Sequence, residues 1–310
     1  MFHVKPSDSA SPNNDFGMDT PLARELADLS SRRKALSGVT VRFSGEPRIF
    51  AMSNQKGGVG KTTSAVNLAS ALAELGAKVL VVDLDPQGNA STALSIPHTA
   101  DVRSIYDVLI DEMPFADIVQ VSPESSNLLC APSTIHLAGA EIELVSQVAR
   151  EFRLRRALEA YLAEHPVDVV IIDCPPSLGL LTINAFTAAS EVLIPIQAEY
   201  YALEGLSQLL GNIQMIQKHL NPQLRLTTIL LTMFDARTRL SQQVAEEVRA
   251  HFPDLVLEAV IPRSVRVSEA PSFGQTVIAY DGNSAGAVAY REAAVEIAQR
   301  GEQSSQNKEQ

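Results

Sequence analysis

One short segment restricts the fold more than any other part of the chain: the glycine-rich sequence KGGVGKTT at residues 56–63. An apolar run, RIFAMSN, precedes it, and a helical pattern, TTSAVNLASALAELG, follows. A strand, a glycine-rich turn and a helix in this order form a phosphate-binding loop, because backbone N–H groups and the positive end of the helix dipole face the anion. The residues expected to surround the phosphates are Gly57, Gly58, Val59, Gly60, Lys61, Thr62 and Thr63.

The loop contains two lysines with different expected roles. Lys61 is placed to reach the β- and γ-phosphates, and the hydroxyl of Thr62 is placed to bind Mg²⁺. The usual pattern has glycine six residues before the lysine, but this chain has Gln55 there, followed by Lys56. A second cation in the loop either crowds Lys61 or points away from its own nucleotide. A lysine that points away can reach a phosphate in a neighbouring subunit.

Three carboxylates follow two strongly apolar runs. VVDLDPQGNAS places Asp83 and Asp85 at the end of one run, and VDVVIIDCPPS places Asp173 at the end of another. The carboxyl edge of a parallel sheet is where ligands bind. Asp85 lies further into its loop and is the better candidate to orient the attacking water, whereas Asp173 is expected to hold Mg²⁺, generally through water. Asp83 is either a strand-end partner or a direct participant.

Short apolar runs alternate with longer helical patterns from Arg48 onwards. This alternation predicts an α/β fold with a mostly parallel central sheet and helices on both faces. The ATPase-type domain is expected over residues 47–300, including one long helical stretch over 136–164 and a final helix over 284–299.

The two ends of the chain differ from this pattern. Residues 1–46 are interpreted as an extension, with disorder over 1–20 and a short helix over 21–36, and residues 301–310 as a polar tail.

The composition of the chain limits which classes of function and partner remain. The net charge of −11 makes the whole chain a poor match for a polyanion, so nucleic-acid binding requires a local basic patch. Two distant cysteines form no disulfide framework, and the six histidines show no metal-ligand spacing. The sequence contains neither a membrane-span pattern nor a signal-peptide core, so a cytoplasmic protein without a membrane partner is expected.

Several long blocks resemble a known family. QKGGVGKTT, VVDLDPQGNAS, IIDCPPSLGLLTINA, PIQAEYYALEGL, TMFDARTRL and IPRSVRVSEAPSFGQ are similar to the ParA/Soj chromosome-partitioning ATPases, over about residues 48–298. This family, with a deviant Walker A loop, belongs to the superfamily that includes MinD. The resemblance implies ATP and Mg²⁺ as cofactors and a sandwich homodimer in which Lys56 contacts the opposite subunit's nucleotide. It makes Lys61, Thr62 and Asp85 parts of the subunit's own catalytic and metal site, and Asp173 the Walker B acid.

The resemblance also implies partners. In this family the ATP-bound dimer binds double-stranded DNA without sequence preference, on the nucleoid, and a ParB-like centromere-binding protein stimulates hydrolysis. The matching DNA-contact motifs contain Arg237 and Arg266, and Arg239 and Arg263 lie nearby.

Two alternatives keep the same chemistry. A MinD-like spatial regulator needs a basic amphipathic C-terminal helix, which GEQSSQNKEQ does not provide. An ATPase of this family that moves another cargo, such as a plasmid or a protein assembly, stays open.

Overall fold

The computed structural model describes residues 20–43, 45–199 and 202–308. They divide into two compact units, with the division between Gly38 and Val39. The first contains α1 (Pro21–Leu36), which begins at the proline because the side chain of Thr20 accepts a hydrogen bond from the Ala23 N–H, at 3.2 Å. The disorder predicted for residues 1–20 falls, except for Thr20, outside the described residues.

The second unit is built on an eight-stranded sheet with the order β3-β4-β2-β5-β1-β6-β7-β8. Its strands are β1 (Arg48–Met52), β2 (Val79–Asp83), β3 (Gln120–Val121), β4 (Leu128–Ala131), β5 (Val169–Asp173), β6 (Glu191–Gln197), β7 (Arg225–Phe234) and β8 (Val256–Pro262). Every pair is parallel except β3 with β4, which is antiparallel. The prediction of a mostly parallel sheet is confirmed.

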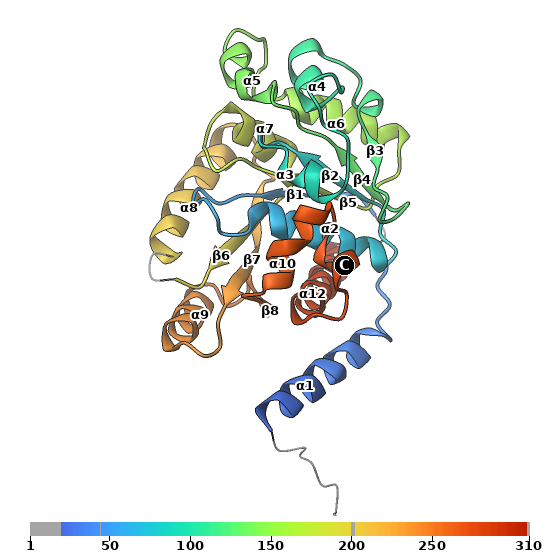
Figure 1. The fold of residues 1–310 in the computed structure, drawn as a ribbon. Helices are drawn as coiled ribbons and strands as arrows, with labels where there is room; N and C mark the ends of the chain where they lie inside the picture. The colour runs from blue at the N-terminus through green and yellow to red at the C-terminus, as the bar shows by residue number, and fades with distance from the viewer. Residues whose placement is uncertain (1–19, 44, 200–201, 309–310) are drawn as a thin grey trace, which may run out of the picture. The chain divides into compact units, whose positions relative to one another are not determined.

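Helices cover both faces of this sheet (Figure 1). They are α2 (Lys61–Glu74), α3 (Asn89–Ala93), α4 (Ile105–Asp111), α5 (Leu137–Leu144), α6 (Arg153–Glu164), α7 (Leu180–Ala188), α8 (Ala202–His219), α9 (Arg239–His251), α10 (Val265–Glu269), α11 (Val277–Tyr280) and α12 (Ala285–Lys308), with 3₁₀ turns η1 (Phe115–Asp117) and η2 (Ala270–Phe273). In the described part of the chain, no helix combines the length and apolar character needed to cross a membrane.

Alternate residues of the buried strands enter two separate cores. In β1, Phe50 and Met52 pack with α2 and α12 on one face, whereas Ala51 packs with α6 and α7 on the other. Strands buried on both faces need apolar side chains at successive positions, which explains the continuous Val, Ile and Leu runs in the sequence.

The prediction of one long helical stretch over 136–164 is wrong, because the structure has two helices there, α5 and α6. Ala149 takes a positive φ of 51° between them. Asn184 of α7 holds the turn: its side chain accepts from the N–H of Leu154 at 3.1 Å and donates to the carbonyl of Arg150 at 2.8 Å. The final helix, predicted to end at 299, continues to Lys308.

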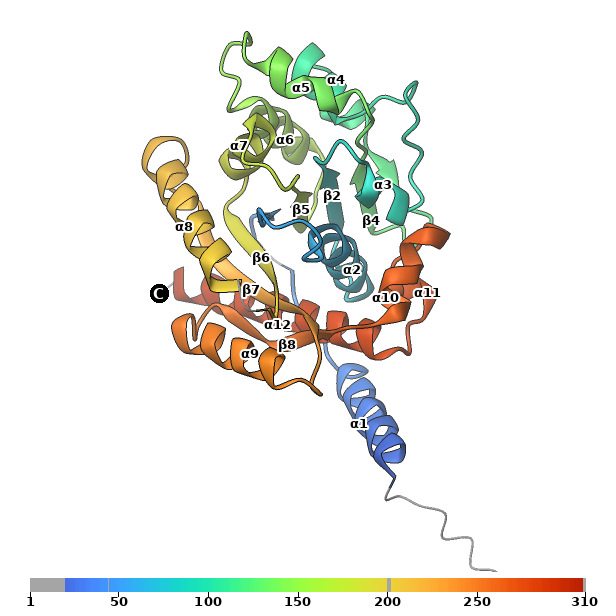
Figure 2. The ribbon, with the colours of Figure 1, turned by 60° about the vertical axis from the view of Figure 1, so that its left-hand side comes forward.

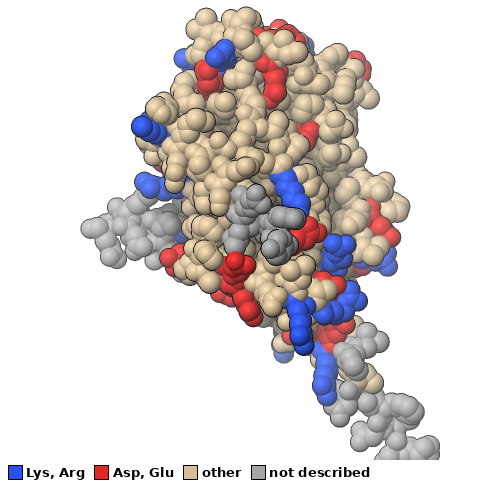
Figure 3. Space-filling view, turned by 90° about the vertical axis from the view of Figure 1, so that its left-hand side faces the viewer, with Lys and Arg blue, Asp and Glu red and all other residues tan. Residues whose placement is uncertain are grey.

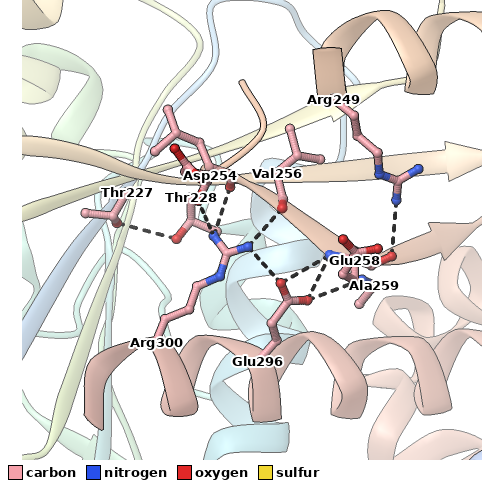
Figure 4. A network of polar contacts seen from close by, with 10 residues as sticks. Thr227, Thr228, Arg249, Asp254, Val256, Glu258, Ala259, Glu296 and Arg300 are labelled. Atoms are coloured by element: carbon pink, nitrogen blue, oxygen red, sulfur yellow. Dashed lines mark hydrogen bonds and ion pairs between the residues drawn. The ribbon is translucent and has the colours of Figure 1, made fainter. Parts of the chain in front are cut away.

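The open edge of β8 is closed by side chains of α12 (Figure 4). The carboxylate of Glu296 accepts hydrogen bonds from the backbone N–H of Glu258 and Ala259, and Arg300 donates to the carbonyl of Val256 at 2.9 Å. An edge strand with unpaired backbone N–H and C=O groups can pair with a further strand of another chain. Glu296 and Arg300 occupy such groups on β8. This network also fixes the strand that leads, after Pro262, into an arginine-containing segment.

Candidate phosphate-binding and hydrolytic site

The glycine-rich loop connects the carboxyl end of β1 to the first turn of α2, which is seen nearly end-on in the centre of Figure 2. Gly58 and Gly60 have positive φ angles of 73° and 86°, a region that only glycine enters without strain. Two side-chain hydrogen bonds hold the loop in place: Thr232 of β7 donates to the carbonyl of Val59 at 2.9 Å, and Asn54, at the start of the loop, donates to the carbonyl of Pro195 in β6 at 2.8 Å. The loop is therefore preorganised as a cradle for an anion.

Lys61 lies inside the site. Its side chain is buried, and its ammonium donates to the carbonyl of Lys56 at 3.3 Å. Burial lowers the pKa of Lys61, and the charges of Asp173, Cys174 and Asp85 act in the opposite direction. The structure thus brings together Lys61, Asp85 and Asp173, as the sequence predicts for a nucleotide site.

Asp83 and Asp173 end the neighbouring strands β2 and β5 and are paired in register. Both side chains are fully buried. Burial, first, and the charge of Asp83, second, raise the pKa of Asp173 well above its usual range, while Thr62 and Lys61 act to lower it. Neither carboxylate oxygen of Asp173 has a hydrogen-bond partner among the described residues.

A buried carboxylate without a hydrogen-bond partner is neutralised either by a proton, which the raised pKa of Asp173 favours, or by a bound cation, and the residues around Asp173 fit Mg²⁺. Thr62, at the start of α2, supplies a hydroxyl, and Asp173 supplies a carboxylate that can bind through water. A bound Mg²⁺ neutralises the negative charge of the β- and γ-phosphate oxygens.

Asp83 differs from Asp173 in its surroundings. Its oxygens accept hydrogen bonds from the N–H of Ser91 at 2.8 Å, the hydroxyl of Ser91 at 2.7 Å and the N–H of Asp85 at 3.3 Å. Burial raises the pKa of Asp83 to about 6 against these hydrogen bonds, which lower it. Because protein donors occupy its carboxylate, the geometry favours a supporting role for Asp83.

Asp85 lies in the loop after β2 and is partly exposed. Its side chain accepts from the N–H of Gln87 at 3.0 Å, and its carbonyl accepts from the N–H of Gly88 at 3.0 Å. A cavity of about 380 Å³ opens beside it, lined by this loop, by α5 and by the Pro175–Pro176 segment after β5. Asp85 therefore combines a fixed backbone with an accessible carboxylate.

Lys56 points elsewhere. Its ammonium lies 2.8 Å from the carboxylate of Glu199, and both side chains are nearly half exposed. Glu199 follows β6 and also accepts a hydrogen bond from the side chain of Gln197. The two lysines of the loop thus have opposite environments, one buried among acids and one at the surface.

The four arginines expected to contact DNA follow β7 and β8. Arg237 is largely exposed and lies 2.8 Å from Asp235, while Arg239 begins α9. The backbone N–H of Arg263 binds the carbonyl of Phe234, which connects the two segments at 3.0 Å. Arg266, on α10, lies 3.4 Å from both Glu269 and Asp281.

Three contributors to the site escape the sequence reasoning: Ser91, Glu199 and Thr232. Ser91 and Glu199 lie within the blocks VVDLDPQGNAS and PIQAEYYALEGL, so their positions alone mark them as candidates. Thr232 reaches the loop from β7, more than 170 residues away along the chain. A contact over that separation carries no local sequence signal.

A mostly parallel sheet, a phosphate loop after its central strand and a buried acid on the adjacent strand define a P-loop nucleoside triphosphatase. The model of a family described as an AAA domain matches residues 47–226. Sporulation initiation inhibitor protein Soj of Bacillus subtilis (strain 168) is 55% identical over 254 residues, which cover 82% of this chain and 99% of the relative. Chromosome partitioning protein ParA of Caulobacter vibrioides (strain NA1000 / CB15N) is 52% identical over 253 residues, or 82% and 94% of the two chains. The chain belongs to the ParA/Soj family.

A solved structure agrees with this assignment. Cobyrinic acid a,c-diamide synthase from Mycobacterium smegmatis, with bound ADP and magnesium, is 38% identical, with a TM-score of 0.69 over 80% of this chain and 93% of that one. Together with the family relationship, the phosphate loop and the orphaned acid make this chain an ATPase with ATP and Mg²⁺ as its cofactors.

Proposed function

We propose that the protein is an ATP-dependent DNA-partitioning ATPase that segregates a chromosome or plasmid. In this proposal the ATP-bound form is a sandwich homodimer that binds double-stranded DNA without sequence preference, on the nucleoid. A ParB-like centromere-binding protein stimulates hydrolysis and ends DNA binding. The observation that carries the proposal is the opposite orientation of Lys61, buried beside Asp173, and Lys56, turned to the surface.

The homodimer is supported by apolar surface on and after α5, the helix that lines the cavity beside Asp85. Ile142, Val145 and Val148, on and just after α5, are exposed by 79%, 59% and 84%, and Leu178 is also exposed in the segment after β5. The side of the molecule that carries α5, α8 and α9 has a broad area with few charged side chains (Figure 3). Exposed apolar surface beside a site with an outward lysine fits a second copy of this chain.

DNA binding is supported by the arginine segments. Arg237, Arg239, Arg263 and Arg266 belong to two adjacent segments, and a dimer doubles their number. Phosphate contacts by arginine release condensed counterions, so binding falls steeply with salt. Because the chain carries a net charge of −11, this local set has to provide the attraction.

Hydrolysis depends mainly on placement of the reacting groups. In the proposed mechanism Lys61 would bind the β- and γ-phosphates, Thr62, Asp85 and Asp173 would hold Mg²⁺, and Asp85 would also accept a hydrogen bond from the attacking water. Lys56 of the second subunit adds positive charge at the phosphates. ATP therefore joins the two subunits until it is cleaved.

A direct experiment separates these steps. Sedimentation of the full-length protein measures its association state with ADP, with ATP and with a non-hydrolysable ATP analogue, and retention on unrelated DNA fragments is measured in parallel. The proposal expects a dimer and DNA retention only with the triphosphates. DNA retention that is equal with ADP and ATP, or a monomer with the analogue, would overturn it.

A further inference from the structure

The carboxylate of Asp83 connects two parts of the catalytic loop. One oxygen, Oδ1, accepts the N–H of Asp85, and the other, Oδ2, accepts both the N–H and the hydroxyl of Ser91. The residues between Asp83 and Ser91 therefore form a closed loop, tied at two points to a single buried group. Asp85, whose carboxylate faces the accessible side, lies inside this loop.

Ser91 is itself fixed. It is fully buried, and its Oγ accepts the backbone N–H of Ser133 at 3.2 Å. A serine hydroxyl has one proton to donate, and the 2.7 Å contact assigns that proton to Asp83. The hydroxyl thus joins the end of β4, the start of α3 and the carboxylate that ends β2.

The far end of α3 is held independently. Ser95, which follows α3, donates its hydroxyl to the carbonyl of Gly274 at 2.6 Å. Gly274 has a φ of 64°, and a side chain there would collide with Ser95, with a Cβ only 2.4 Å from its Oγ. The Ser95 hydroxyl bonds neither Ser91 nor Asp83, so the geometry between those two residues is set by their own contacts at 2.8 and 2.7 Å.

We propose that Ser91 is a positioning residue for ATP hydrolysis, which acts through Asp83 to fix the loop that carries Asp85. Its hydroxyl holds the Asp83 carboxylate away from the phosphates, beside Asp173 but not in competition with it for the cation. The inference rests on the role of Asp85 proposed above, and it is independent of DNA binding. Loss of an outer-shell hydrogen bond of this kind typically lowers activity about 10- to 100-fold.

The test measures steady-state hydrolysis at saturating ATP and Mg²⁺, together with ATP affinity, for full-length Ser91→Ala, Ser91→Thr and Ser95→Ala. We expect Ser91→Ala to lower kcat about 10- to 100-fold with an ATP affinity within about threefold of the parent, because the phosphate loop is untouched. Ser91→Thr, which keeps the hydroxyl, should recover most of that loss. Ser95→Ala is the matched control: it removes another hydroxyl next to α3 and should keep kcat within about threefold.

A parallel Asp85→Ala variant separates the two proposals. Normal turnover in Asp85→Ala would refute the role of Asp85 itself. Lost turnover in Asp85→Ala with normal turnover in Ser91→Ala would refute the positioning role of Ser91. Equal losses in Ser91→Thr and Ser91→Ala, or a fall in ATP affinity that matches the fall in kcat, would also overturn it.

Two further variants keep the test decisive if Ser91→Ala does not fold. Ser91→Cys fills the same space with a weak donor and should hydrolyse as slowly as expected for alanine; a parent-like rate would contradict the inference. Comparison of Asp83→Asn with Asp83→Asn/Ser91→Ala tests whether Ser91 acts through Asp83, because the losses in hydrolysis rate do not add when one residue acts through the other. The double variant should be no slower than Asp83→Asn, and a product of two separate losses would show that Ser91 does not act through Asp83.

Discussion

Asp83 and Asp173 are register partners on adjacent strands and are both fully buried, yet only Asp83 receives hydrogen bonds from the described residues. The difference divides two chemically identical groups into two functions. Asp83 accepts hydrogen bonds from donors of its own chain and supports the loop after β2. Asp173 keeps its oxygens available, at the cost of an uncompensated carboxylate in the interior, and this is the property a metal-holding acid needs.

Asp173→Asn is expected to abolish hydrolysis and to stabilise the nucleotide-free protein. The raised pKa of Asp173 means that its charged form is disfavoured in the folded state, and the amide removes that penalty. At pH 8 the variant should melt about 2 °C or more above the parent, since 1 kcal/mol shifts the melting temperature by roughly 2–4 °C in chains of 150–250 residues and by less in longer ones. Calorimetry without nucleotide measures this difference.

The difference in melting temperature between Asp173→Asn and the parent should depend on pH. A carboxyl with a raised folded-state pKa destabilises the fold once pH exceeds its usual value of 3.8, and the penalty is complete above the folded pKa. The gap between Asp173→Asn and the parent should therefore close as pH falls towards 4. A gap that is constant from pH 8 to pH 4 would show that the charge of Asp173 is not its cause.

Lys56→Ala should bind ATP but fail to dimerise, because its ammonium lies at the surface against Glu199 and, in the proposed dimer, serves the nucleotide of the second subunit. The contact between Lys56 and Glu199 leads to a second prediction, on the ATP dependence of dimerisation. An exposed ion pair contributes about 0.2–1 kcal/mol, so Glu199→Gln should free Lys56 and lower the ATP concentration for half-maximal dimerisation by up to about fivefold. Sedimentation across an ATP titration measures both. Glu159→Gln, which breaks a comparable exposed pair with Arg155, is the control and should change nothing.

Arg266→Glu and Arg237→Glu should each abolish DNA retention while ATP-driven dimerisation persists. Four to six phosphate contacts in a dimer give a log–log salt dependence of roughly −4 to −5, and each substitution removes two contacts. The charge-neutral change Arg266→Gln should then reduce this slope by about 2, as measured by binding titrations at several salt concentrations. Arg155→Glu, on α6, matches the charge change away from these segments and should retain DNA; equal loss in Arg155→Glu would point to net charge as the cause.

The sequence predicts the sheet and its long helices because strands buried on both faces leave continuous apolar runs. β6 and β7, for example, coincide with the apolar runs EVLIPIQ and RLTTILLTMF. The short elements α3, α10 and α11 are absent from the prediction, since four or five residues leave no readable period. The break between α5 and α6 was missed for another reason: Asn184, on a different helix, determines it.

The candidate site, like the fold, is predicted from the sequence only in part. Lys61, Asp85 and Asp173 follow from local patterns, because the loop and the strand ends are continuous segments with a recognisable order. The different roles of Asp83 and Asp173 do not follow from them, since both read as an acid after an apolar run. The contacts of Ser91 and of the Asp85 N–H with Asp83 distinguish the two acids, and the Ser91 contacts depend on how α3 folds back after the strand.

Truncation of the N-terminal extension should give two different results at two nearby positions. The second compact unit begins at Val39, eight residues before the predicted start of the ATPase domain. Within those eight residues Val41 and Phe43 pack against the core that contains α2 and α12, and the N–H of Arg42 donates to Glu302 at 2.6 Å.

Removal of residues 1–38 should therefore leave ATP hydrolysis and the melting temperature near those of the full chain. Removal of residues 1–46 should lower the melting temperature by several degrees, because two partly buried side chains are lost at about 1 kcal/mol or more each. Calorimetry and ATP hydrolysis on the two truncated proteins, with the double variant Val41→Ala/Phe43→Ala in the full chain as the control, check this. Equal melting temperatures for the two truncations would show that residues 39–46 contribute no packing, and a collapse of hydrolysis in the shorter truncation would give residues 1–38 a role in the active site.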